Sequence, residues 1–203
     1  LFASGTTLPN HPTRYSSETS KYHLTSGTDV LEVRLGWSGS DGLKVSKIYT
    51  FRRNDYVVDI RYEVTNNSRK PRELYLYTQF LRHYIDPGTS ITTLPTYTGG
   101  VVYTPDKKYE KIDFEQMRKK PLARDVDGGW IAMLQHYFVG AWLPAAKDRI
   151  QYYTDAQGND NFALGYKTLN PVTAGVGEKA ILKTQLYIGP KEQHRLEKAA
   201  EGL

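Results

Sequence analysis

The sequence predicts an all-β fold of the sandwich or barrel type. Short runs of aromatic and β-branched residues alternate with turn signals at intervals of roughly 8 to 20 residues, which is typical of such folds. Tyrosine is the commonest aromatic residue, with 16 copies, and it suits strands that have one buried and one wet face. No internal repeat and no linker-like stretch divides the 203 residues, so we expect a single domain.

The first strands follow an irregular start. Residues 1–28 are rich in Ser, Thr, Gly and Pro without sustained periodicity, and we expect an irregular lead-in there. Val30–Leu35 then reads as a strand, Ser38–Gly42 as a turn, and Leu43–Arg52 as a second strand. Arg53–Asp55 supplies a hairpin-like connection to the next strand.

The clearest strand runs from Tyr56 to Thr65. Tyr56, Val58, Ile60, Tyr62 and Val64 alternate with Asp59, Arg61, Glu63 and Thr65. A period of two places the apolar set on one face and the charged set on the other. Asn66–Ser68 is expected to end this strand, because these residue types hydrogen-bond locally and tolerate left-handed backbone.

The rest of the chain has the same character until its end. Leu74–Ile85 fits a strand or a helix by periodicity, and its aromatic residues favour a strand. Further turns are expected at Asp86–Gly88, Gly99–Gly100, Thr104–Asp106, Asp127–Gly129, Gln157–Asp160 and Asn170–Pro171.

Only the C-terminal end has a helical pattern. Pro190 suits a first helical position, and Leu196, Ala199, Ala200 and Leu203 fall on one stripe. We therefore expect a C-terminal helix over residues 190–201. It either packs over one end of a sheet or connects to something beyond Leu203.

The charge pattern does not indicate a nucleic-acid site. The formal net charge is +5 and the pI is near 9.2, but acidic residues interrupt every basic cluster and no aromatic-interleaved basic motif occurs.

The first residue is not Met, and the longest mostly apolar run, residues 137–146, is half the length of a membrane-spanning helix. We expect a soluble piece of a longer protein, monomeric in isolation.

No motif for catalysis, metal binding or cofactor binding is present. The chain lacks cysteine, and it contains no phosphate-binding glycine loop, no GxSxG elbow and no paired histidines. The five histidines stand alone in sequence, which is typical of structural residues. We therefore predict no catalytic, metal-binding or cofactor-binding residue.

The densest aromatic segment is Gly128–Pro144. It contains two Trp, a Tyr and a Phe among nearly continuous apolar residues. Such a segment either fills the core between two sheets or lines a sugar-binding platform. Its continuous apolar character favours strands that are buried on both faces, and therefore the core.

This segment resembles the GGWxAMLQxYFxxAWxP stretch of YidC-type membrane protein insertases of Gram-negative bacteria. Three other segments resemble stretches of the same family in the same order: Tyr49–Val58, Tyr103–Lys111 and Leu186–Lys191. The resemblance runs from about Asp29 to Leu203. It is weaker before Asp29, which suggests a piece that begins inside the family's large periplasmic domain.

The resemblance implies a β-supersandwich, with two large antiparallel sheets similar to those of galactose mutarotase and a short C-terminal helix. It implies a periplasmic, non-catalytic accessory domain of an inner-membrane insertase and chaperone. The partners would be SecD–SecF and other Sec translocon subunits, nascent membrane proteins and the membrane part of the insertase. The family-signature residues, expected to be mainly structural, are Gly128, Gly129, Trp130, Tyr137, Phe138, Trp142 and Pro144. The candidate partner-contact residues are Arg69, Lys107, Lys108, Lys191, Glu192, Arg195 and Lys198.

Two alternatives remain open at this point. A mutarotase-like enzyme needs a general acid and a general base at one sugar carbon, for which His83, His136, and Glu110 or Glu115 are the available residues. A carbohydrate-binding module needs exposed rings in a shallow groove, for which Trp37, Trp130 and Trp142 are the candidates.

Overall fold

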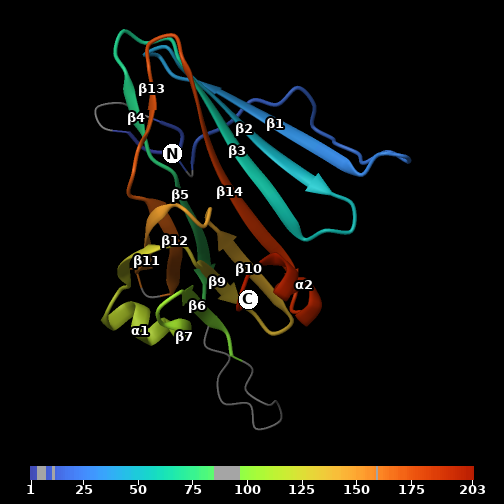
Figure 1. Ribbon diagram of the computed structural model, residues 1–203, viewed down its shortest axis with the longest axis vertical. Helices are drawn as coiled ribbons and strands as arrows, with labels where there is room; N and C mark the ends of the chain where they lie inside the picture. The colour runs from blue at the N-terminus through green and yellow to red at the C-terminus, as the bar shows by residue number, and fades with distance from the viewer. Residues whose placement is uncertain (4–7, 11, 85–96, 159) are drawn as a thin grey trace. The chain divides into compact units, whose positions relative to one another are not determined.

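The computed structural model describes the chain except residues 4–7, 11, 85–96 and 159. Backbone contacts group it into two compact units (Figure 1). Unit 1 comprises Leu1–Tyr77 and Thr168–Leu186, and unit 2 comprises Thr78–Lys167 and Tyr187–Leu203. The expectation of a single domain stays a prediction. The expected all-β class with large antiparallel sheets and a short C-terminal helix is confirmed.

Unit 1 is built from a long antiparallel ribbon and a small two-stranded sheet. The ribbon has the order β1-β2-β3-β14, and the small sheet pairs β4 with β13. The lead-in contributes two isolated bridges, Phe2 to Tyr75 and Ser16 to Gly36. The strands are β1 (Val30–Ser38), β2 (Leu43–Arg52), β3 (Val57–Asn66), β4 (Arg72–Leu74), β13 (Val172–Ala174) and β14 (Lys179–Pro190), whose last residues belong to unit 2.

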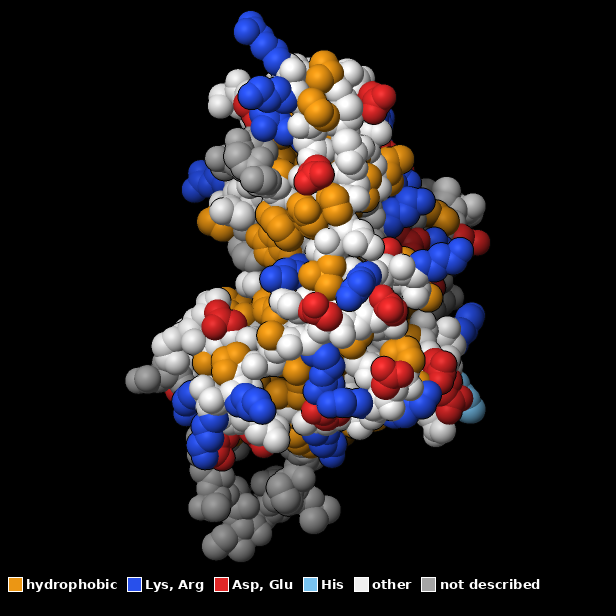
Figure 2. Space-filling model, turned by 60° about the vertical axis from the view of Figure 1, so that its left-hand side comes forward, with side chains coloured by type: hydrophobic (Ala, Val, Ile, Leu, Met, Phe, Trp, Pro, Cys, Tyr) orange, Lys and Arg blue, Asp and Glu red, His pale blue; other side chains and the backbone are white. Residues whose placement is uncertain are grey.

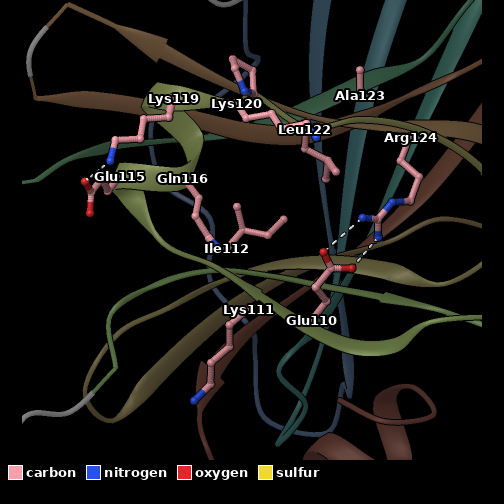
Figure 3. A pocket seen from close by; sticks show the side chains of 11 residues that line it. Glu110, Lys111, Ile112, Glu115, Gln116, Lys119, Lys120, Leu122, Ala123 and Arg124 are labelled. Carbon is pink, nitrogen blue, oxygen red and sulfur yellow. Dashed lines mark hydrogen bonds and ion pairs between the residues drawn. The ribbon is translucent and has the colours of Figure 1, made fainter.

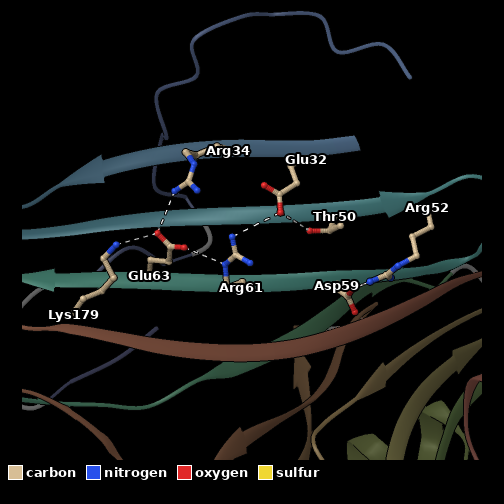
Figure 4. A network of polar contacts seen from close by, with 8 residues as sticks. All are labelled: Glu32, Arg34, Thr50, Arg52, Asp59, Arg61, Glu63 and Lys179. Atoms are coloured by element: carbon tan, nitrogen blue, oxygen red, sulfur yellow. Dashed lines mark hydrogen bonds and ion pairs between the residues drawn. The ribbon is translucent and has the colours of Figure 1, made fainter. Parts of the chain in front are cut away.

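The period-two pattern of β3 is confirmed. Val58, Ile60, Tyr62 and Val64 are buried, because alternate side chains of a strand point to opposite faces. Side chains of the opposite face form ion pairs within β3 and, across β2, with side chains of β1 (Figure 4). The Glu63 carboxylate forms ion pairs with nitrogen atoms of Arg34 at 3.3 Å, Arg61 at 3.1 Å and Lys179 at 3.5 Å. Burial by itself would raise the pKa of the Glu63 carboxyl. The hydrogen bond and charge of Arg34, together with the charges of Lys179 and Arg61, outweigh burial and lower this pKa.

Unit 2 contains two sheets, with strand orders β14-β10-β9-β6-β7 and β5-β12-β11-β8. Its core is formed by side chains that are almost fully buried, among them Ile131, Ile150, Tyr152, Phe162 and Tyr166. The strands are β5 (Tyr77–His83), β6 (Gly99–Thr104), β7 (Lys108–Ile112), β8 (Ala123–Asp127), β9 (Trp130–Leu134), β10 (Phe138–Leu143), β11 (Arg149–Gln157) and β12 (Asn161–Thr168). The helices are α1 (Phe114–Lys119) and α2 (Gln193–Ala199).

Three local expectations were wrong. Gly99 and Gly100 begin strand β6 instead of forming a turn, and a Cβ on Gly100 would lie 2.5 Å from the methyl group of Met117. Pro190 ends β14 instead of starting a helix. Helix α1 was not expected, although Asp113 and Gln116 form a capping box that the sequence displays. The expected turn at Asp86–Gly88 lies outside the described residues.

Charged side chains of both signs share the surface. On the face shown in Figure 2, acidic and basic side chains are interspersed and do not form a large patch of one sign. The ion pairs of the described residues fit this distribution, since most are formed by partly exposed side chains. Pairs of this kind contribute little to stability individually.

Candidate interaction surface in the C-terminal region

The Gly128–Pro144 segment forms the antiparallel hairpin of β9 and β10. Its two strands are surrounded differently: β9 is buried on both faces, whereas β10 alternates between buried and less buried residues. Trp130 is 2% exposed, and Pro144 directly follows the last residue of β10. The expectation of a core segment is therefore confirmed for β9.

Gly128 and Gly129 connect β8 to β9, and both have the positive φ angles that glycine adopts more readily than other residues. Their φ angles are +78° and +91°. A Cβ on Gly129 would lie 2.1 Å from the backbone oxygen of Tyr103. Cβ atoms do not approach a backbone oxygen this closely, so a side chain at this position would force the backbone to move. These two glycines are required by the turn itself, which agrees with a structural role.

Tyr137 and Phe138 do not belong to the core. Tyr137 is 69% exposed and Phe138 is 57% exposed. Tyr137 lies in the turn between β9 and β10, and Phe138 is the first residue of β10. The expectation that these rings are buried is wrong. The backbone oxygen of Tyr137 accepts a hydrogen bond from the Lys191 N–H at 2.9 Å, so this exposed turn lies beside the segment that leads into α2.

A cluster around Glu201 attaches the end of the chain to the sheet. The Trp130 indole N–H donates to the Glu201 backbone oxygen at 2.9 Å, and the Tyr103 hydroxyl donates to the Glu201 carboxylate at 2.7 Å. The Tyr103 and Trp130 rings are stacked with centroids 5.6 Å apart. Gly202 follows with a φ of +72°, and a Cβ there would lie 2.4 Å from the Tyr103 ring. We call Tyr103, Lys108, Trp130, Glu201 and Gly202 the C-terminal clamp.

Lys108 supplies the positive charge of the clamp. Its ammonium group donates to the Tyr103 hydroxyl at 3.2 Å and lies 3.7 Å from the Glu201 carboxylate. The hydrogen bond from Tyr103 and the charge of Lys108 lower the pKa of the Glu201 carboxyl. The same contacts, the Tyr103 hydrogen bond first, raise the pKa of Lys108.

Helix α2 is exposed although it is attached at both ends. None of its residues is buried. Arg195 and Lys198 of the helix are exposed, and so are Lys191 and Glu192 directly before it. Arg195 pairs with Glu192 at 2.7 Å. The helix lies between the Lys191 contact with Tyr137 and the C-terminal clamp. Contacts with the sheet therefore hold the chain on both sides of the helix.

The structure brings only some of the candidate contact residues together. Lys108 pairs with Glu201, which follows the end of α2, and Lys107 lies in the exposed turn before Lys108. Arg69 is exposed near the end of β3 in unit 1, a different compact unit. Sequence reasoning did not find Tyr103, Glu201 or Gly202, whose contacts join positions that are about a hundred residues apart in the chain.

A second feature of unit 2 is a groove between β7, α1 and β8, with a volume of about 550 Å³ (Figure 3). Arg124 crosses it to form a two-pronged ion pair with Glu110, at 2.8 and 3.1 Å. This hydrogen bonding lowers the pKa of Glu110. The groove is lined by Glu110, Lys111, Ile112, Glu115, Gln116, Lys119, Lys120, Pro121, Leu122, Ala123 and Arg124.

The residues considered for sugar chemistry have other partners. Glu110 binds Arg124 and Glu115 binds Lys119, while the His83 ring is hydrogen-bonded with Asn161 at 3.1 Å. His136 contacts the Tyr137 ring. Within the described residues, no group of three or more His, Cys, Asp or Glu side chains is arranged to hold a metal ion.

The tryptophans do not form an exposed platform. Trp130 is buried in the C-terminal clamp. Trp142 is half-buried and its ring lies 5.4 Å from that of Phe80, centroid to centroid. Trp37 is half-buried on β1. The exposed rings of the segment are Tyr137 and Phe138 instead.

Comparison with known proteins decides the family. The sequence model described as the YidC periplasmic domain matches residues 1–203. The chain belongs to the YidC periplasmic domain family. The match includes the first 28 residues, so the weaker resemblance noted for them in the sequence does not exclude them from the family.

Relatives in the family are named membrane protein insertase YidC. The protein of Alkalilimnicola ehrlichii is 39% identical over 189 residues, which cover 93% of this chain and 34% of that protein. The protein of Methylobacillus flagellatus is 37% identical over 200 residues, which cover 98% of this chain and 36% of that protein. The chain thus spans about a third of the length of the curated relatives it matches. In the described residues, no helix has the length and apolar character needed to cross a membrane.

Solved structures confirm the expected fold type of this YidC periplasmic domain. A galactose mutarotase related enzyme from Lactobacillus acidophilus aligns with a TM-score of 0.55 and 6% identity, covering 89% of this chain and 73% of that one. An alpha-galactosidase from Lactobacillus brevis aligns with a TM-score of 0.58 and 9% identity, covering 91% and 27% respectively. At such low identity the likeness concerns the fold alone.

Proposed function

We propose that this chain is a non-catalytic accessory domain that acts in the periplasm as part of an inner-membrane insertase. It supports the insertion and folding of membrane proteins by binding other proteins, among them SecD–SecF and further Sec translocon subunits. Membership of the YidC periplasmic domain family supports the insertase context. Nascent membrane proteins and the membrane part of the insertase are the other expected partners.

Helix α2 carries the proposal. It displays Arg195 and Lys198 to solvent, and Lys191 and Glu192 are exposed directly before it, while the C-terminal clamp and the Tyr137 contact hold the segments on either side of the helix. A contact element that is already ordered loses little conformational entropy on binding. Its mixed charges suit recognition by complementary charge, which governs partner choice and association rate more than affinity.

Site-specific photocross-linking in inner membranes tests this role. A photoreactive residue replaces Arg195 or Lys198 in the full-length insertase, and Lys183, an exposed lysine of β14, carries it in the control. We expect adducts with SecD or SecF from the two α2 positions and none from Lys183. Equal yields from all three positions, or no adduct from α2, would contradict the proposal.

A further inference from the structure

The turn between β9 and β10 exposes two consecutive aromatic rings. Tyr137 is 69% exposed, the largest fraction among the described large hydrophobic residues, and Phe138 is 57% exposed. Single exposed apolar side chains are ordinary on protein surfaces, whereas neighbouring ones indicate a contact surface. In Figure 1 this turn lies next to α2, at the same end of unit 2.

Ile188 of β14 extends this apolar surface. The Lys191 N–H donates to the Tyr137 oxygen, so the end of β14 lies beside the start of β10, its neighbour in the sheet. In the antiparallel register that this contact sets, Ile188 lies opposite Gly140. Phe138, two residues before Gly140, belongs to the same face. Phe138 and Ile188, which is 56% exposed, are therefore diagonal neighbours on that face. We call Tyr137, Phe138 and Ile188 the apolar edge.

The segments that carry the apolar edge contain no acidic residue. Residues 135–138 and 188–191 have one charged side chain between them, that of Lys191, which is exposed. The nearest acidic residue in the sequence, Glu192, is paired with Arg195 at 2.7 Å. The exposed rings are thus flanked by polar side chains and a single lysine.

These features match the interface of a lipid bilayer. Aromatic rings are enriched at the level of the lipid headgroups, where apolar and wet surroundings meet. A lysine beside them keeps its alkyl chain on the apolar surface while its ammonium group reaches outward to the phosphates. The rings are more than half exposed at a hairpin turn, so they stand out from the surface and do not line the walls of a concave ligand site.

We propose that the apolar edge contacts the surface of a lipid bilayer. Tyr137, Phe138 and Ile188 enter the headgroup region, and the Lys191 ammonium group binds a lipid phosphate. Three side chains bind weakly by themselves, but in the inner-membrane setting proposed above the bilayer is tethered close to the domain, which raises its effective concentration. The contact holds α2, which begins two residues after Lys191, near the membrane surface.

Fluorescence quenching in nanodiscs tests the contact. The full-length insertase, in a version without other cysteines, carries an NBD fluorophore on Gln135→Cys, an exposed position before the rings. The nanodiscs contain phosphatidylethanolamine and phosphatidylglycerol, with or without a lipid that has a doxyl quencher at headgroup level. We expect this lipid to quench the probe about threefold more strongly than a probe on Lys120→Cys. Lys120 is exposed after α1, beside β7 at the opposite end of the strand order.

A double variant and a matched control connect the quenching to the rings. Tyr137→Ser combined with Phe138→Ser should reduce quenching of the Gln135 probe to the level found at Lys120. Leu81→Ser is the control, because it removes a side chain of β5 that is 59% exposed and lies outside the apolar edge. It should leave the quenching unchanged. Circular dichroism establishes that each variant is folded.

Three results would overturn the proposal. The first is the absence of quenching at the Gln135 probe, and the second is quenching that persists in the double variant. The third is a blue-shifted NBD emission without quenching, because protein and not lipid would then cover the turn. The nanodiscs contain no Sec subunit, so these outcomes are independent of the cross-linking test of α2, and either proposal can fail while the other stands.

Discussion

The two halves of the Gly128–Pro144 segment have opposite surroundings. From Gly128 to Leu134 the chain is enclosed by the backbone of β6 and by the C-terminal clamp. From Gln135 to Phe138 it turns in solvent, with Tyr137 69% exposed. Continuous apolar sequence therefore serves two purposes here: the first half specifies the fold, and the turn presents aromatic surface beside α2.

The largest expected effect concerns Gly129. Replacing it with alanine places a Cβ 2.1 Å from the Tyr103 oxygen at a φ of +91°, so backbone must move. We expect Gly129→Ala to lower the free energy of unfolding by about 3 kcal/mol or more. Gly177→Ala is the control, because φ there is +78° but nothing lies within 4 Å of the new Cβ. It should cost about 1 kcal/mol. Urea unfolding measures both, and equal losses would contradict this account.

The two tryptophans provide a matched pair. The Trp130 N–H donates to Glu201, whereas the buried Trp142 N–H has no hydrogen-bond partner among the described residues. We expect Trp130→Phe to cost about 1 kcal/mol more than Trp142→Phe, because only the former loses a made hydrogen bond. Thermal unfolding of both variants is the measurement. A larger loss of stability in Trp142→Phe than in Trp130→Phe would contradict the expectation that the Trp130 hydrogen bond in the clamp stabilises the fold.

The exposed turn should matter little for stability. Tyr137→Ser and Phe138→Ser each remove a mostly solvated ring, so each should change the free energy of unfolding by about 0.5 kcal/mol or less. Chemical denaturation followed by tryptophan fluorescence gives the values. A loss as large as that of Trp130→Phe would mean that the turn belongs to the core after all.

The smallest effect is a titration within the clamp. The Tyr103 hydrogen bond and Lys108 lower the pKa of Glu201, so its contribution is present above the unfolded-state pKa and is lost as the pH falls through the folded-state pKa. Carboxyl NMR should show a depressed Glu201 pKa that moves back toward its ordinary value in Tyr103→Phe. An unchanged pKa in that variant would exclude the hydrogen bond as the cause.

Much of the local structure was predictable because its signals are local. The alternation along β3 and the turn residues before β2 indicated the strands and their faces directly. Helix α1 was not expected, although its capping box is also a local signal in the sequence. The groove was not predictable, since its two walls come from strands whose free edges are defined only by which strands pair elsewhere. The clamp was equally inaccessible, because Glu201 meets Tyr103 and Trp130 only in the folded chain.

The sequence by itself determined the all-β class, the faces of its clearest strand and the family, because periodicity, turn chemistry and a long specific motif are written in consecutive residues. Only the tertiary structure decided that Trp130 is buried while Tyr137 and Phe138 are exposed. All three lie in one apolar run, and burial depends on which distant segments cover each side chain. For Trp130 these are β6 and the end of the chain. No described segment covers the two rings at the turn to the same degree, so they remain in solvent.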